Sequence, residues 1–448
     1  MTNRPGTSRI RSCNSFRLLA FAPSLLCALT MITVQSTQAQ TYQVIYDFTG
    51  GAGGSGPVAG LTMDQAGNIY GTTSAGGPGF YGDVFKLTRK GSGWVFNSLH
   101  NFTGRSDGCR PFSGLIFDGA GNLYGTTAYG GAPGCPDQGG PGNGIVFKLS
   151  PPPCATAPCP GTETVLYDFA GGSDGSHPDG YGGGALVFDR AGNLYGTTSN
   201  GGLPGCEGGC GTVFELSHSG SGWTESVLYR FTGGSDGAVP TSTLIFDQAG
   251  NLYGTAMVGG LSGCSFSTYH GCGTVFELSP SGSGWTESVL YSFTGSCDGS
   301  MPAGGLIFGP SGDLYGTTAS GGEGGGGTVF QLTPSNGSWT LETLHSFSGT
   351  IGPSATLAMD GVGNLYGTTG SDGAYEQGNV FELKPSSGGW TYTSLHDFCS
   401  APRCIDGAAS QSNVIFDRNG NLYGTAVYGG AITNSEFFNN GVVWEITP

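Results

Sequence analysis

The sequence GNLYGTT occupies residues 121–127, and near copies of it recur along the whole chain. Seven copies are present, and they begin at Gly67, Gly121, Gly192, Gly250, Gly312, Gly363 and Gly420. Successive copies are 51 to 71 residues apart. A catalytic site is built once in a chain, so a motif that returns at this period indicates a repetitive scaffold.

Each repeat of about 60 residues predicts four β-strands. The first strand is apolar throughout, as at residues 244–246, which predicts burial on both faces. The second is the repeated motif, and its mid-strand glycine predicts close approach of another backbone. The third and fourth, at residues 211–216 and 223–231, alternate with period two. An Asp-x-x-Gly-Asn sequence between the first two strands predicts a tight hairpin turn.

Four antiparallel strands repeated seven times predict an all-β fold, a seven-bladed β-propeller of four-stranded blades. Parallel β-helices use shorter rungs, and helical solenoids need a 3.6-residue period that this sequence lacks. Residues 42–48 match a fourth strand, whereas the last repeat ends after its third strand at residues 441–446. We therefore expect the N-terminal strand to complete the seventh blade and close the ring, which leaves no open sheet edge.

Residues 1–39 have the pattern of a secretory signal peptide, with four arginines before an apolar run at residues 18–34. We expect cleavage after Ala39 and a single propeller domain over residues 40–448. A transmembrane anchor is the alternative, but the apolar run is short and Pro23 interrupts it.

Removal of residues 1–39 leaves eleven basic residues against 31 acidic ones, a formal net charge of −20. A surface of this charge repels nucleic acid and anionic membranes. We therefore expect no nucleic-acid partner, no membrane insertion after cleavage, and a monomer.

The chain has thirteen cysteines, of which eleven follow residue 39. Closely spaced cysteines in an exported protein predict local disulfides. The predicted bonds are Cys154 with Cys159, Cys206 with Cys210, Cys264 with Cys272, Cys399 with Cys404, and Cys109 with Cys135. Zinc is the alternative, but there is no CxxC pair with companion histidines. An odd number leaves one free thiol, for which Cys297 is the candidate.

The pattern DxxGNLYGTT…GG…GTVFxL…W…LYxF resembles the Gloeo/Verruco (GloVer) tandem repeat of exported bacterial proteins. The resemblance covers about residues 42–448. It implies an exported propeller and brings no catalytic residues. Members of that family often carry a C-terminal surface anchor, and this chain ends inside its last blade, so we expect release into the extracellular space or periplasm.

Loops that join the fourth strand to the next first strand, and the second strand to the third, emerge on one side of a propeller. We call this side the long-loop face and the opposite side the turn face. Binding residues usually lie on long loops held by a rigid scaffold, and the short hairpin turns offer little room for a site.

An Asp-Gly sequence recurs in the loops of the long-loop face, with the carboxylates Asp107, Asp174, Asp236, Asp298 and Asp406. One interpretation is an acidic rim for Ca²⁺ or a cationic ligand. The alternative is that each carboxylate accepts backbone hydrogen bonds within its own turn. The sequence places the best calcium candidate near Asp372 and Glu376 beside Asp406, and calcium is the only cofactor it suggests.

Loop aromatic residues are candidates for glycan binding, among them Tyr129 and Tyr375, together with Phe80, Tyr81, Tyr269, Phe437 and Phe438. All six tryptophans instead occupy repeat positions. We expect a secreted binding or structural module. Its ligand, an extracellular glycan or a cell-surface protein, would bind on the long-loop face. The alternative is a propeller hydrolase or lyase acting on extracellular polysaccharide, in which two carboxylates such as Glu207 and Glu323 would serve as acid and base; the sequence assigns no catalytic residue. No Ser/His/Asp or Cys/His set can be assembled, which disfavours an enzyme.

Overall fold

The structure is a computed structural model, and the fold is that of the unit Gln40–Pro448. It describes residues 40–136, 142–150, 160–178, 184–220, 222–261, 263–266, 269–282, 284–431 and 440–448. The predicted signal segment lies outside these ranges. Within them there is no α-helix, and no helix is long and apolar enough to cross a membrane.

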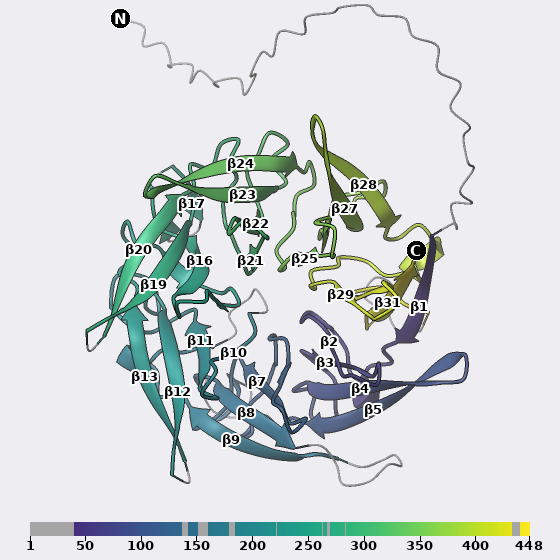
Figure 1. The fold of residues 1–448 in the computed structure, drawn as a ribbon. Coiled ribbons are helices and arrows are strands. Elements are labelled where there is room, and N and C mark those ends of the chain that lie inside the picture. Colours follow the sequence, from purple (N-terminus) through teal and green to yellow (C-terminus); the bar gives the residue numbers. More distant parts are fainter. Residues whose placement is uncertain are drawn as a thin grey trace, which may run out of the picture. The chain divides into compact units, whose positions relative to one another are not determined.

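Seven antiparallel sheets are arranged in a ring, which is the predicted seven-bladed β-propeller (Figure 1). The first strands of the blades are β2 (Thr62–Met63), β6 (Ile116–Phe117), β10 (Val187–Phe188), β15 (Ile245–Phe246), β21 (Ile307–Phe308), β25 (Ala358–Met359) and β29 (Ile415–Phe416). The second strands are β3 (Ile69–Thr73), β7 (Leu123–Thr127), β11 (Leu194–Thr198), β16 (Leu252–Val258), β22 (Leu314–Thr318), β26 (Leu365–Thr368) and β30 (Leu422–Ala426).

The third and fourth strands are longer. The third strands are β4 (Asp83–Lys90), β8 (Ile145–Ser150), β12 (Thr212–Ser219), β19 (Thr274–Ser281), β23 (Thr328–Ser335), β27 (Asn379–Ser386) and β31 (Val442–Thr447). The fourth strands are β5 (Gly93–Asn101), β9 (Thr162–Asp168), β13 (Gly222–Arg230), β20 (Gly284–Ser292), β24 (Ser338–Ser346), β28 (Gly389–Asp397) and β1 (Thr41–Asp47). The short elements are β14 (Ala238–Pro240), β17 (Ser265–Phe266), β18 (Tyr269–His270) and the 3-10 turns η1 (Gly51–Gly53), η3 (Gly172–Asp174) and η4 (Pro402–Cys404).

The N-terminal strand closes the ring, as predicted. β1 pairs antiparallel with β31, and Tyr42 lies opposite Ile446 while Asp47 lies opposite Val442. Figure 1 shows β1, at the start of the colour scale, beside β31, at its end. The seventh blade therefore joins residues about 400 positions apart, and the two edges that an open sheet would expose are paired with each other.

The repeated motif builds the hairpin between the first two strands. In blade 2, Asp118 Oδ1 accepts hydrogen bonds from the backbone N–H groups of Ala120 and Asn122 at 2.9 and 2.8 Å. Its Oδ2 accepts from the Asn122 amide at 2.6 Å and from the Tyr124 hydroxyl at 3.1 Å. Gly121 supplies the positive φ of 83° that the turn needs. Asp, Gly, Asn and Tyr of the motif thus form one hydrogen-bonded unit.

The mid-strand glycine faces a side chain and not another backbone, which corrects the prediction. A Cβ on Gly125 would lie 2.8 Å from the ring of Phe147 in β8. Third-strand phenylalanines such as Phe147 are fully buried, and any side chain on the second strand would displace the ring. The next motif residue links blades, since Thr72 Oγ1 donates to the backbone oxygens of Pro111 and Ser113 in blade 2 at 3.3 and 3.2 Å.

Two predicted strands differ in detail from the structure. The first strands pair over only two residues each, and β15 is only partly buried rather than enclosed on both faces. In β13 a bulge interrupts the alternation, because Val213 lies opposite Tyr229 while Phe214 lies opposite Val227. Leu228 and Tyr229 therefore both pack against the core. Bulges of this kind add local twist to a strand.

Candidate functional site

The long-loop face is held by disulfides. Cys109–Cys135 joins a fourth-to-first loop to a second-to-third loop, which places both loop sets on the same face. The other bonded pairs within the described residues are Cys206–Cys210, Cys264–Cys272 and Cys399–Cys404. The structure therefore confirms four of the five predicted bonds.

Two predictions about the remaining cysteines are not confirmed. Cys297 is itself disulfide-bonded, so the prediction that it is the free thiol is wrong. An odd number of cysteines shows that one is left over, but it does not say which, and Cys297 has no close neighbour in the sequence to guide the choice. The predicted bond between Cys154 and Cys159 is not confirmed either, because Cys159 lies outside the described residues, as does Cys154. That bond stays a prediction.

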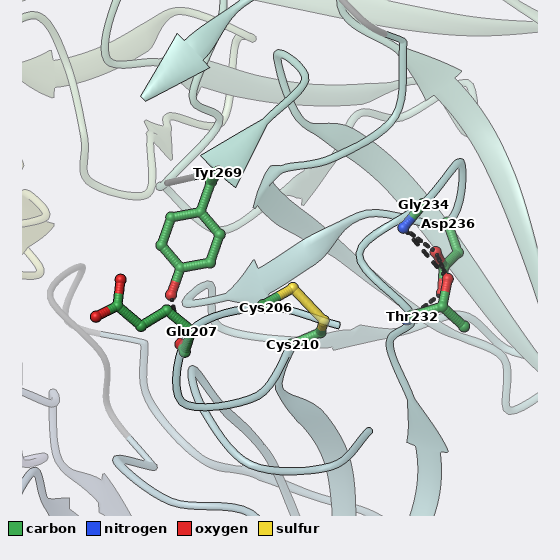
Figure 2. Close-up of a disulfide and its surroundings, with 7 residues drawn as sticks. All are labelled: Cys206, Glu207, Cys210, Thr232, Gly234, Asp236 and Tyr269. Carbon is green, nitrogen blue, oxygen red and sulfur yellow. Dashed lines mark hydrogen bonds between the residues drawn. A yellow bond between two sulfur atoms is a disulfide. The ribbon is translucent and has the colours of Figure 1, made fainter. Parts of the chain in front are cut away.

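The recurring aspartates of this face bind within their own turns. Asp236 accepts hydrogen bonds from the backbone N–H groups of Thr232 and Gly234 at 2.7 and 3.2 Å, and from the Tyr229 hydroxyl at 3.1 Å. Figure 2 shows its carboxylate turned toward Thr232 and Gly234. Asp107, Asp174, Asp298 and Asp406 are held in the same way. Each accepts a hydrogen bond from a backbone N–H group four to six positions earlier in the chain. This geometry matches the local structural interpretation of the motif.

Two of the three residues proposed for calcium have separate side-chain partners. Asp406 lies 3.2 Å from His396 Nε2, and Asp372 accepts a hydrogen bond from Ser348 Oγ at 3.3 Å. Glu376 is exposed on a loop at a positive φ of 55°. No group of three or more His, Cys, Asp or Glu side chains that could hold a metal ion occurs in the part of the chain that the structure describes.

The loop aromatic residues are scattered. Tyr129 packs edge-on against His177, with ring centroids 4.8 Å apart, and lies under the Arg110 guanidinium. Tyr375 and Phe80 are exposed, at 51% and 70% of their surface, and come from blades 6 and 1. Tyr269 instead donates its hydroxyl to the backbone oxygen of Glu207 at 2.9 Å (Figure 2). Phe437 and Phe438 lie outside the described residues.

The proposed acid and base, Glu207 and Glu323, lie on loops of blades 3 and 5, with blade 4 between them. The Tyr269 hydroxyl of blade 4 donates a hydrogen bond to the backbone oxygen of Glu207. The two carboxylates therefore belong to loops that the ring keeps apart, and the structure gives no support for using them as a glycosidase pair.

A cavity of about 1190 Å³ lies on the turn face. In each blade the first and second strands form the inner hairpin, and the third and fourth strands form the outer hairpin. The turns of the inner hairpins of blades 3, 4 and 5 line the cavity, at residues 188–191, 246–250, 308–310 and 312. Pro280 and Trp285 of the outer hairpin of blade 4 also line it. The prediction that this face offers little room is therefore wrong. Leu252, the first residue of β16, pairs with Leu278, and β19 continues for three more residues. The hairpin of the third and fourth strands thus extends about 10 Å past the level of Leu252, and its residues Pro280 and Trp285 line the cavity.

The cavity combines aromatic and polar side chains. Its apolar lining includes Phe188, Phe246 and Phe308, and the ring of Trp285 packs edge-on against Tyr195 with centroids 6.5 Å apart. A further set of polar residues lines it, namely Asp189, Asp247, Arg190 and Gln248. The two carboxylates already accept hydrogen bonds from Asn193 and Asn251. Arg190 and Gln248 are exposed side chains of the lining and are available for hydrogen bonds.

A second cavity, of about 310 Å³, lies where the first strands of all seven blades begin. Its lining includes several small residues such as Gly60 and Gly114, and Thr243 accepts a hydrogen bond from the Ala185 N–H at 2.8 Å. Asn413 lies directly over Gly60. This space along the ring axis is at the lower limit of a small-molecule site.

Comparison with known proteins identifies the repeat. The sequence profile of the Gloeobacter/Verrucomicrobia repeat matches residues 30–181 and 263–448. A search of the curated proteins found no match.

Solved structures with a similar fold include the extracellular domain of a hybrid two-component system from B. thetaiotaomicron, at 14% identity and a TM-score of 0.53. The match covers 90% of this chain and 39% of that one, so this chain spans well under half of its length. A protein described as a gluconolactonase matches at 16% identity, covering 64% of this chain and 77% of that one, with a TM-score of 0.35. A protein from Bacteroides uniformis described as a 6-phosphogluconolactonase matches at 15% identity. The match covers 76% of this chain and 84% of that one, with a TM-score of 0.44. At these identities the likeness concerns the fold alone.

Proposed function

Because the chain belongs to the Gloeobacter/Verrucomicrobia repeat family, we propose that it is an exported binding module that holds a neutral glycan segment in the turn-face cavity. The observation that carries this proposal is the cavity of about 1190 Å³, whose lining combines aromatic rings with polar side chains. Ligand sites in proteins have this combination of mostly apolar lining with a few polar groups. The proposal moves the site from the long-loop face, where the aspartates are bound within their own turns, to the turn face.

The net charge of the protein limits the class of ligand that the turn-face cavity can bind. The full chain carries a formal net charge of −16, and residues 40–448 carry −20. A polyanion such as nucleic acid or an acidic polysaccharide is repelled by this field. Sugar rings have apolar faces that pack against aromatic side chains and hydroxyls that accept from groups such as Arg190 and Gln248, both exposed at the cavity. A neutral glycan satisfies both requirements.

The test is a glycan array that holds neutral and acidic glycans and peptidoglycan fragments, probed with residues 40–448. We expect neutral glycans to bind, and Trp285→Ala to weaken binding at least tenfold. Trp390→Ala is the matched control, because Trp390 packs edge-on against Tyr315 at 6.0 Å as Trp285 does against Tyr195. Trp390 does not line the cavity. Equal losses in the two variants, or binding confined to acidic glycans, would contradict the proposal.

Export is the second part of the proposal. Four disulfides in the described residues, Cys109–Cys135 among them, support folding in an oxidising compartment. Expression of the full chain in a bacterial host should yield an exported product whose N-terminus is Gln40. Mass spectrometry of the cytoplasmic and exported fractions measures this. A product that keeps residues 1–39 and stays in the cytoplasm would overturn it.

A further inference from the structure

The seven interfaces between neighbouring blades differ at one position of the fourth strand. This position lies four residues before the Tyr or His of the Leu-Tyr-x-Phe segment. Going around the ring from blade 1, it is occupied by Phe96, Glu163, Glu225, Glu287, Leu341, Tyr392 and Tyr42. The aromatic side chains at this position stack on the Tyr or His of the preceding blade. The glutamates interact electrostatically with that Tyr or His, and Leu341 packs in the same core cluster as Tyr291.

Three interfaces are sealed by parallel stacking of two rings. Tyr46 of blade 7 stacks on Phe96, with centroids 4.7 Å apart and an interplanar angle of 7°. His345 stacks on Tyr392 at 4.2 Å and 3°. The third pair is Tyr42 on His396, at 3.5 Å and 5°.

Three other interfaces place a glutamate in the same position. Oε1 of Glu163, Glu225 and Glu287 is buried in each case and has no hydrogen-bond partner among the described residues. A buried oxygen without a partner requires an explanation. Because three such oxygens occupy equivalent positions, the same explanation should apply to all three.

The common feature is an aspartate of the preceding blade. An electrostatic interaction links Glu163 with Asp107, Glu225 with Asp174, and Glu287 with Asp236. These three aspartates belong to the Asp-Gly loops. Their carboxylates already accept hydrogen bonds from backbone N–H groups of their own turns. For Glu225 the two carboxyl groups are within hydrogen-bonding reach. Two neighbouring carboxylates cannot both ionise without repulsion.

We propose that each of these three interfaces holds one proton, with the glutamic acid donating a hydrogen bond to the aspartate, and that loss of the proton to solvent loosens the packing between blades 1 to 4. The proton gives the buried Oε1 the partner that it lacks. It also leaves the aspartate ionised, as its bonds from backbone N–H groups require.

The electrostatics of each site agree with this arrangement. Burial first, and then the charge of Asp174, raise the pKa of Glu225 to about 7, against the opposing effect of Arg230 on the same strand. Burial and Asp236 raise the pKa of Glu287 to about 7. The charge of Glu287 in turn contributes to the raised pKa of Tyr229.

The interface between blades 1 and 2 adds a histidine. Burial raises the pKa of Glu163 to about 7, although His100 lowers it, and Asp107 raises it further. His100 Nε2 lies 3.7 Å from Asp107 Oδ2. This interface therefore has two acids and one base, whereas the other two have no histidine at the site.

The direction of the pH effect follows from the pKa values. The glutamates have a pKa of about 7 in the folded protein and an ordinary value of 4.5. A carboxyl whose pKa is raised by folding contributes stability that is fully present below pH 4.5 and is lost as the pH rises through 7. We therefore expect residues 40–448 to melt at a higher temperature at pH 5.5 than at pH 8.5.

The test is the triple variant Glu163→Gln, Glu225→Gln, Glu287→Gln in residues 40–448, melted at pH 5.5 and 8.5 in EDTA. Glutamine donates the same hydrogen bond at every pH, so the triple variant should melt higher than the parent at pH 8.5 and should lose most of the pH difference. The control is Glu342→Gln, an exposed glutamate on β24 next to Leu341, which should behave as the parent.

Two results would overturn the proposal. The first is an unchanged pH difference in the triple variant. The second is stabilisation of the parent, but not of the triple variant, by millimolar Ca²⁺ at pH 8.5 with EDTA omitted, which would mean that the paired carboxylates hold a cation instead of a proton. Carbon-13 NMR of the glutamate carboxyls provides a direct measure, and three resonances titrating near pH 4.5 would also exclude the shared proton.

Discussion

The interfaces on the two sides of the ring are sealed by different chemistry on the same backbone. Between blades 1 and 4 the contact position is a glutamate beside an aspartate, whereas between blades 5 and 6, 6 and 7, and 7 and 1 it is a ring stacked on a ring. Stacked rings contribute packing energy at any pH, and a carboxyl pair contributes only while it holds a proton. Identical strand geometry can therefore give interfaces that depend differently on pH.

The loops explain part of this difference. The loop after blade 7 has Gly53 where its counterparts carry aspartate, and the loop after blade 5, at residues 348–353, has no aspartate. Both of these interfaces use stacked rings. Between blades 6 and 7 the aspartate is present, but His396 binds Asp406 and Tyr42 donates to its backbone oxygen. An aspartate therefore faces a glutamate only where no ring pair occupies the site.

The largest effect should come from the closing strand. Deletion of residues 40–49 removes β1, and with it the buried Phe48 and the two stacked tyrosines Tyr42 and Tyr46. We expect a loss of roughly 5 kcal/mol of unfolding free energy or complete failure to fold, by the burial of several large apolar side chains. Urea unfolding at pH 5.5 and 8.5 measures it. A truncated protein as stable as the parent would show that the ring does not need this strand.

Truncation of one stacked ring should cost less and should not depend on pH. Tyr392→Ala removes the ring that stacks on His345, and we expect a loss of about 3 kcal/mol. Burial raises the pKa of Tyr392 to about 12 and lowers that of His345, so both rings are neutral at pH 8.5. The loss of free energy at that pH should equal the loss at pH 7.5. A markedly larger loss at one of these values would remove the distinction between ring pairs and carboxyl pairs.

The Cys206–Cys210 disulfide should contribute equally at both pH values, because it closes a single loop and is not itself a titrating group. Cys206–Cys210 closes a short loop that packs over Gly233. Replacing both cysteines by alanine should cost about 2 kcal/mol, measured by thermal unfolding at pH 5.5 and 8.5. If the cost instead appears only at pH 8.5, the cross-link supports the carboxyl interfaces, and the two effects are coupled.

The smallest and most specific effect should come from building a fourth carboxyl pair. Leu341 occupies the contact position between blades 4 and 5, next to Tyr291, whose hydroxyl donates to Asp298 at 3.0 Å. Leu341→Glu should lower stability by about 1 kcal/mol more at pH 8.5 than at pH 5.5, which corresponds to roughly one pKa unit. Leu341→Gln is the control for lost apolar contact. Identical pH profiles for the two variants would show that an acid at this position is not enough.

Much of the fold could be predicted from the repeat. Seven copies of an Asp-x-x-Gly-Asn turn fix seven hairpins locally, because Asp118 bonds with residues no more than six positions away. The free fourth strand at one end and the missing one at the other predicted the closure between β1 and β31. The pairing of Cys206 with Cys210 followed from short spacing in the same way. The same argument for Cys159 is not confirmed, since that residue lies outside the described ones.

The site was harder to predict, because it depends on neighbouring blades. The cavity on the turn face arises from the unequal lengths of inner and outer hairpins in blades 3 to 5. The glutamates 163, 225 and 287 occupy equivalent positions of the repeat, but the sequence analysis singled out only the aspartates of the preceding loops. Nothing in the alignment showed that a side chain of one blade faces the loop of the blade before it.

The sequence by itself determined the number of blades, the strand order and the turns, because these depend on hydrogen bonds between residues close together and on a period that the chain repeats. Only the tertiary structure decided which side chains meet across the blade interfaces and where the molecule is hollow. Glu225 and Asp174, 51 positions apart in the chain, are brought together by the packing of whole sheets. The ionisation of such a pair depends on burial and on the charge beside it, and neither is a property of a local sequence.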